Sequence, residues 1–140
     1  MMEFVRVFDL RYHSRAVLLA LQLEARSRAG KPIVPANREG RGRRSLDARE
    51  GELAVVASRR AVARFCRLNS CLTRSIVLFQ LLEKRYPVRL EIGFRSGGEG
   101  PDGHAWVTVD GKPLGEPHGS LDGYSTVEGD GSHASAIDAP

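Results

Sequence analysis

The sequence predicts an α+β fold in which helices come first and a small antiparallel sheet follows. Apolar residues recur at helical spacing in the first part of the chain, up to residue 86. Residues 88–95 and 104–114 instead alternate apolar and polar side chains, as strands with one buried face do. Separate runs of helices and strands are typical of α+β domains. A chain of 140 residues, 41% of them hydrophobic, fits one domain with a modest core.

The first predicted helix covers residues 14–28. Ser14 can cap its start, and Gly30 and Pro32 end it. Its apolar stripe, which we expect to face the core, comprises Val17, Leu18, Leu21 and Ala25. Residues 30–46 are rich in glycine, proline and arginine, and their composition predicts an exposed, mobile loop that includes the basic stretch 38–44.

Two more helices are predicted before the sheet. The second covers residues 50–65. Its expected buried side comprises Leu53, Val56, Ala57 and Val62, and its expected solvent side comprises Arg59, Arg60 and Arg64. The third begins near Cys71 and ends before Pro87. It is apolar around most of its circumference, which predicts a central position in the core.

The strands are predicted from period-two alternation. Residues 88–95 form the first strand, residues 96–103 (SGGEGPDG) a flexible loop, and residues 104–114 a second strand that enters a turn at Asp110-Gly111. From residue 119 onward the composition predicts little order. The predicted division is therefore 1–48 for the N-terminal helix and basic mobile loop, 49–118 for the core, and 119–140 for a flexible C-terminal segment.

Charge and composition narrow the class of protein. Residues 1–85 carry a formal charge of +10 and residues 86–140 carry −6. A basic half can bind nucleic acid, lipid or an acidic partner, but a solvated surface that pairs with the acidic half is favoured. The stretch 38–44 lacks interleaved aromatics, so no nucleic acid partner is predicted. We expect no transmembrane segment, no secretory signal, no disulfide framework and no phosphate loop, hence a soluble cytoplasmic protein without a cofactor.

Cys71 is the first candidate for chemistry. It follows Asn69 and Ser70, both capping residues, and opens the third helix. The free N–H groups and the dipole at a helix N-terminus stabilise a thiolate. Buried cysteines are nevertheless common core residues, and taken alone Cys71 fits that role better.

His104 changes this balance. In its strand, His104 shares one face with Trp106 and Thr108, and the apolar face made by Ala105 and Val107 goes to the core. A cysteine at a helix start and a histidine on a strand face can form a thiolate–imidazolium pair. A zinc site made by Cys66, Cys71, His104 and His118 is disfavoured because a long helix begins at the second cysteine, and we predict no metal.

The combined motifs are fairly specific. The string CLTRSIVLFQLLEKRYPVRLEIGFR, followed by GHAWVTVDGKPLGE, resembles the leader peptidases of lasso-peptide biosynthesis, most closely the stand-alone protease half of a split B protein. These belong to the transglutaminase-like, papain-like cysteine protease group. The resemblance covers about residues 50–117. It implies a Cys-His-acid triad, with Cys71 as nucleophile and His104 as general base and acid.

The third triad member is less clear from the sequence. The family carries a carboxylate about a dozen positions after the histidine, which is Glu116 here. Asp110 is the rival, but along a strand it lies roughly 20 Å from His104, and it suits a turn better. A two-residue loop at Asp110-Gly111 points Glu116 away from His104, whereas a three-residue loop points it toward the histidine. Pro113 and Gly115 make a register shift or bulge feasible.

The resemblance implies a function: removal of the leader from a ribosomally made lasso-peptide precursor, a step in antibiotic biosynthesis, through a thioester intermediate. It also implies a separate leader-recognition protein and an ATP-dependent macrolactam cyclase as partners. The backbone N–H of Cys71 is a candidate oxyanion donor, and Asn69, Ser70 and Trp106 are candidate site-lining residues. Two alternatives stay open: a non-catalytic peptide-binding module with the same core, and an acyltransferase that uses the same Cys-His pair.

Overall fold

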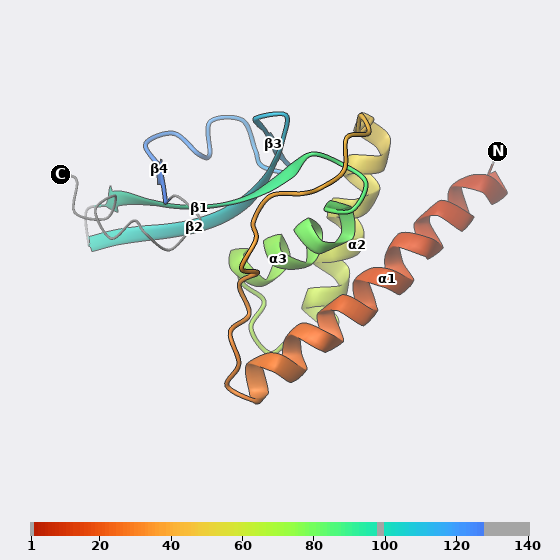
Figure 1. Ribbon diagram of the computed structural model, residues 1–140, viewed down its shortest axis with the longest axis horizontal. Helices are drawn as coiled ribbons and strands as arrows, with labels where there is room; N and C mark the ends of the chain where they lie inside the picture. Colours follow the sequence, from red (N-terminus) through yellow and green to blue (C-terminus); the bar gives the residue numbers. More distant parts are fainter. Residues whose placement is uncertain (1, 98–99, 128–140) are drawn as a thin grey trace.

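The structure, a computed structural model, describes residues 2–97 and 100–127 (Figure 1). Within these residues three helices precede four strands, which confirms the α+β class. The elements are α1 (Met2–Arg28), α2 (Ala48–Phe65), α3 (Cys71–Leu82), β1 (Val88–Gly97), β2 (Gly100–Val109), β3 (Lys112–Leu114) and β4 (Ser125–Thr126). No helix among these residues is both long enough and apolar enough to cross a membrane.

The four strands form one antiparallel sheet in the order β3-β2-β1-β4. β1 and β2 make a long hairpin whose far end extends beyond the helices in Figure 1. Its register runs from Val88 opposite Val109 to Gly97 opposite Gly100. Most of residues 96–103, predicted as a flexible loop, therefore lie in paired strands, and residues 98–99 fall outside the described residues. The glycines of this segment do not prevent strand pairing, because the register set by the preceding residues of β1 and the following residues of β2 continues into it.

α3 lies at the centre of the core, as the sequence predicts. It contacts α1, α2, β1 and β2. Eight of its twelve residues are buried: Thr73, Ser75, Ile76, Val77, Leu78, Phe79, Leu81 and Leu82. A helix that packs on neighbours from several sides needs apolar residues around most of its circumference, which explains the pattern seen in the sequence.

The predicted buried stripe of α1 is mostly wrong. Val17 is partly buried and packs against the core, but Leu18 and Leu21 are 56% and 46% exposed and Ala25 is exposed. The fully buried residues of α1 are Ala16, Ala20 and Leu23. Small alanines let α1 approach its neighbours closely, so packing geometry outweighs side-chain hydrophobicity here. Ser14 is also not a cap: α1 begins at Met2, and the Ser14 hydroxyl donates to the Leu10 carbonyl inside the helix at 2.8 Å.

The prediction for α2 is partly correct. Asp47 caps the helix by accepting a hydrogen bond from the Glu50 N–H at 2.8 Å. The three arginines at 59, 60 and 64 are exposed, as expected. Leu53 and Val56, expected in the core, are only half-buried. The buried face of α2 comprises Gly51, Ala54, Val55, Ala57, Ser58, Ala61 and Val62.

The basic stretch 38–44 is anchored, where the sequence predicts a mobile loop. Its backbone donates hydrogen bonds from Gly40 to Val88, from Arg41 to Glu83 and from Arg44 to Arg85, at 2.7, 2.7 and 3.0 Å. Gly42 lies so close to this backbone that a Cβ atom would stand 1.8 Å from the Arg85 carbonyl carbon. The arginine-rich composition suits the exposed side chains of Arg41, Arg43 and Arg44, but it gives no information about the backbone hydrogen bonds beneath them.

The C-terminal segment is partly organised, although the sequence predicts little order after residue 119. Residues 125–126 pair with β1, and the Val127 N–H donates to the Ile92 carbonyl at 2.7 Å. The guanidinium of Arg38, which is buried, donates to the Val127 carbonyl at 2.6 Å. The rest of the predicted flexible segment, residues 128–140, lies outside the described residues.

Candidate active site

The start of α3 is held by a capping box. Ser70 is the N-cap residue, and its hydroxyl accepts a hydrogen bond from the Thr73 N–H at 3.2 Å. In return, the Thr73 hydroxyl accepts from the Ser70 N–H at 3.0 Å. Because both bonds close around Cys71, the first residue of the helix, its position is set by local sequence. Ser70 is thus a structural cap.

Asn69 also has a structural partner. Its side-chain oxygen accepts a hydrogen bond from the Arg74 guanidinium at 2.9 Å, and Arg74 also donates to the Asn69 backbone carbonyl at 3.3 Å. Asn69 is exposed and does not line the cavity described below. Its role as an oxyanion donor remains a prediction, and its observed contacts brace the turn before Cys71.

His104 lies near the middle of β2, where β3 no longer covers the strand. β3 pairs only with Val107, Thr108 and Val109, so the edge of β2 beside His104 is open to α3. Ser75, one turn after Cys71, donates from its hydroxyl to the Ala105 carbonyl at this edge, at 2.9 Å. This bond ties the helix that carries the thiol to the strand that carries the imidazole.

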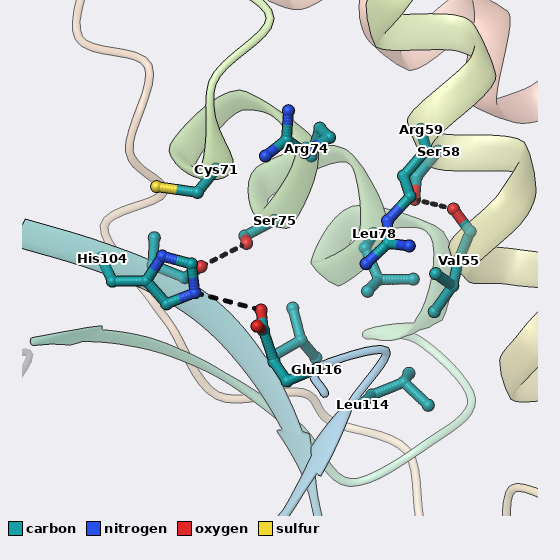
Figure 2. A pocket seen from close by; sticks show the side chains of 12 residues that line it. Val55, Ser58, Arg59, Cys71, Arg74, Ser75, Leu78, His104, Leu114 and Glu116 are labelled. Carbon is teal, nitrogen blue, oxygen red and sulfur yellow. Dashed lines mark hydrogen bonds and ion pairs between the residues drawn. The ribbon is translucent and has the colours of Figure 1, made fainter. Parts of the chain in front are cut away.

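The imidazole has a carboxylate partner. Its Nε2 atom lies 3.2 Å from Oε1 of Glu116, and the two side chains are only 24% and 16% exposed. Figure 2 shows the ring between the Cys71 thiol and the Glu116 carboxylate. With Nε2–H donating to Glu116, the other ring nitrogen, Nδ1, is left as an acceptor for a thiol proton.

Cys71, His104 and Glu116 line one cavity of about 90 Å³ (Figure 2). Its apolar wall comes from α2, α3, β2 and β3: Val55, Leu78, Ala105, Val107 and Leu114. Its polar lining comprises Ser58, Arg59, Arg74 and Ser75 in addition to the three candidate residues. The three residue types that covalent acyl transfer requires therefore meet in one partly enclosed place.

Glu116 reaches His104 despite the hairpin register. The turn is the two-residue form, since Val109 pairs with Lys112 across Asp110 and Gly111, which have φ of 51° and 78°. That form alone would point Glu116 away from the histidine. Gly115 ends the ladder with φ of 75° and so changes the direction of the chain before Glu116. Asp110 is a turn residue, as its left-handed φ requires.

Trp106 packs behind the histidine and does not line the cavity. It is 5% exposed, and its ring is stacked on the imidazole with centroids 5.8 Å apart. A Cβ atom on Gly93, which pairs with His104 in the β1–β2 ladder, would lie 2.8 Å from the indole, so glycine is needed for this packing. Trp106 therefore does not line the site itself. It supports the imidazole ring of His104 from behind.

Tyr124 is a site neighbour that the sequence reasoning missed. Its ring lies 5.6 Å from the imidazole, and its hydroxyl donates to Asp102 at 2.6 Å. That bond raises the pKa of Tyr124 and, together with Arg95, lowers the pKa of Asp102. Arg95 also lies over the Tyr124 ring, 4.6 Å from its centroid. The signal for Tyr124 in the sequence is a tyrosine within a segment that is otherwise rich in glycine, serine and aspartate.

The second cysteine is unrelated to the cavity. Cys66 is 9% exposed, its thiol lies 3.5 Å from the Ala20 carbonyl, and burial raises its pKa. Within residues 2–97 and 100–127, no three histidine, cysteine, aspartate or glutamate side chains form a group able to hold a metal ion. Cys66 is thus a core thiol, whereas Cys71 lines the cavity.

One family model matches most of the chain. The model of the Transglutaminase-like superfamily matches residues 15–128, a range that contains all three helices in whole or part, the sheet and the three candidate residues. No curated protein and no solved structure matches the chain.

Proposed function

The chain belongs to the transglutaminase-like superfamily, and on this premise we propose that it is a cysteine peptidase. The observation that carries the proposal is the lining of one cavity by Cys71, His104 and Glu116, with the last two in contact. Structural cysteines need no histidine beside them, and a structural His–Glu pair needs no thiol at a helix start. The three together form the constellation used for covalent acyl transfer.

The proposed reaction runs in two stages. Cys71 Sγ attacks the scissile carbonyl carbon while its proton passes to Nδ1 of His104, and this proton then goes to the leaving amine as the amide C–N bond breaks. A water molecule, deprotonated by the same nitrogen, attacks the thioester and releases the thiol. Glu116 accepts the Nε2–H of His104 throughout and stabilises the imidazolium. The Cys71 N–H, at the N-terminus of α3, contributes to stabilising the oxyanion.

The proposed substrate is a lasso-peptide precursor, cleaved at the end of its leader. The support is the resemblance carried by the CLTRS and HAWVTVDG motifs, each of which contributes residues to the cavity lining. We further propose that a separate leader-recognition protein presents the precursor, and that an ATP-dependent cyclase uses the released core. An acyltransferase with the same residues would pass the thioester to an amine in place of water.

The experiment is cleavage of the precursor in the presence of its recognition protein, followed by mass spectrometry. We expect Cys71→Ala to lower the rate by more than about 100-fold, because it removes the nucleophile. Cys66→Ala is the matched control, since Cys66 is a buried thiol away from the cavity, and it should cleave at nearly the parent rate.

Three results would count against the proposal. Equal cleavage by Cys71→Ala and the parent chain would exclude Cys71 as nucleophile. A product mass that includes an added amine would favour acyl transfer over hydrolysis. Absence of any Cys71-dependent product with the full set of partners would favour a non-catalytic binding module.

A further inference from the structure

The direction of Glu116 is not explained by its own hairpin. Continued past Leu114, which pairs with Val107, the ladder would set Glu116 opposite Ala105 and on the face away from His104. The observed contact with His104 therefore depends on the turn at Gly115. Glycine permits a φ of 75° but does not impose it, so another part of the fold must select this conformation.

α2 supplies three contacts to this turn, from residues spaced one helical turn apart. Gly51 lies against Leu114, since a Cβ atom there would stand 3.0 Å from the leucine Cδ1. A Cβ atom on Gly115 would stand 2.9 Å from both methyl carbons of Val55. Arg59 then donates from Nη2 to the Gly115 carbonyl at 2.6 Å. Residues four apart share a helix face, so one face of α2 holds the end of the hairpin.

We infer that Arg59 is a positioning residue for the proposed triad: its bond to the Gly115 carbonyl turns Glu116 toward His104. The inference rests on the proposed function for its kinetic consequence, though not for its geometry. A hydrogen bond from a charged donor is stronger than one between neutral groups, and it fixes the orientation of this peptide group. The orientation of the next residue follows, and Glu116 in turn selects which imidazole nitrogen carries the proton.

The test compares Arg59→Met with Arg60→Met in the full chain. Both changes remove an exposed arginine from the same helix, but only Arg59 bonds to the turn. The first readout is the ¹⁵N NMR spectrum of the His104 ring, assigned with a His104→Gln sample. We expect the parent and Arg60→Met to show mainly the Nε2–H tautomer. Arg59→Met should shift toward the tautomer mixture of a free imidazole, and Arg59→Lys should restore much of the parent spectrum.

The second readout is precursor cleavage. We expect Arg59→Met to lower kcat by about 10- to 100-fold with little change in KM, because a misplaced catalytic group weakens the chemical step rather than binding. A residue that only stabilised β3 would shift the unfolding transition and leave the tautomer of the folded protein unchanged. Should the methionine variant not fold, Arg59→Gln, which keeps a shorter neutral donor, takes its place in both measurements.

The outcomes separate the two proposals. An unchanged tautomer and unchanged cleavage in the folded Arg59 variant overturn the positioning role, as does an equal change in Arg60→Met. A parent chain that never cleaves the precursor overturns the peptidase proposal, yet the NMR comparison still decides whether Arg59 orients Glu116. A tautomer shift confined to the Arg59 variants supports the inference whatever the substrate proves to be.

Discussion

Replacing Ser75 by alanine should weaken both the fold and the proposed chemistry. The Ser75 hydroxyl donates to the Ala105 carbonyl at 2.9 Å, and the two residues are 7% and 2% exposed. This carbonyl has no partner in the β1–β2 ladder: Ile92, opposite Ala105, turns its own carbonyl to Val127, so the pair is of the non-hydrogen-bonded type. Without the hydroxyl, a buried carbonyl is left unsatisfied.

The size of the effect follows from two opposing terms. An unsatisfied buried carbonyl costs about 1–3 kcal/mol. Alanine has a higher helix propensity than serine and recovers about 0.5 kcal/mol. The net loss in free energy of unfolding is thus about 0.5–2.5 kcal/mol for Ser75→Ala. Because this bond joins α3 to β2 between Cys71 and His104, we also expect a fall in kcat of about tenfold.

Ser58 provides a matched control. It is also a buried serine that lines the same cavity, but its hydroxyl donates to the Val55 carbonyl within its own helix at 2.9 Å. That carbonyl keeps its helical partner when the hydroxyl is removed. Ser58→Ala should therefore change the free energy of unfolding by no more than about 0.5 kcal/mol and leave kcat near the parent value.

The assay is urea unfolding followed by the fluorescence of Trp106, the single tryptophan of the chain. With a urea slope of about 1–3 kcal/mol per M, this loss should lower the unfolding midpoint of Ser75→Ala by about 0.2–2.5 M at an unchanged slope. A midpoint and kcat equal to those of the parent would refute the reasoning. So would an equal loss in Ser58→Ala, because the effect would then belong to any cavity serine.

Two further predictions concern titrating groups. Burial and a hydrogen bond to Glu50 raise the pKa of Tyr86 above that of an unfolded tyrosine, so its contribution to stability is complete below about pH 10 and is lost as the pH rises further. Urea unfolding should show that the free energy of unfolding falls less between pH 9 and 11 for Tyr86→Phe than for the parent. An equal fall in the two proteins would contradict this prediction. Iodoacetamide at pH 8 should label Cys71, which lines the cavity, well before Cys66, whose burial raises its pKa. Mass mapping of the labelled peptides gives the order of labelling. Labelling of Cys66 first would contradict the assignment of Cys71 as the reactive thiol and Cys66 as the core thiol.

The sequence was most informative where local chemistry decides the structure. The start of α3 at Cys71 follows from the Ser70 cap, and the turn at Asp110 and Gly111 follows from residues that tolerate a left-handed φ. The sequence was least informative about which face of α1 is buried. There the choice between alanines and leucines depends on how closely α2 and α3 approach, which no local pattern records.

Tyr124 illustrates a second limit. It lies twenty residues after His104 in the chain and packs beside it because β4 crosses back to the edge of β1. A two-residue strand leaves no periodic pattern from which this return can be predicted. The composition of residues 119–140 predicts disorder, and Tyr124 is the one feature of this segment that favours a packed structure.

Two residues of the candidate site, Cys71 and Glu116, are positioned in different ways. Cys71 is placed by its own capping box, so its position follows from four consecutive residues. Glu116 is placed by a turn that its hairpin does not determine, held by an arginine 56 residues away from Gly115. A register argument confined to the hairpin therefore leads to the wrong direction for Glu116 even though its loop length is right. The position of a reactive residue on a capped helix, such as Cys71, can be predicted from neighbouring residues. The position of Glu116, which orients the catalytic base, depends on tertiary contacts, so substitutions far away in the chain should disturb it most.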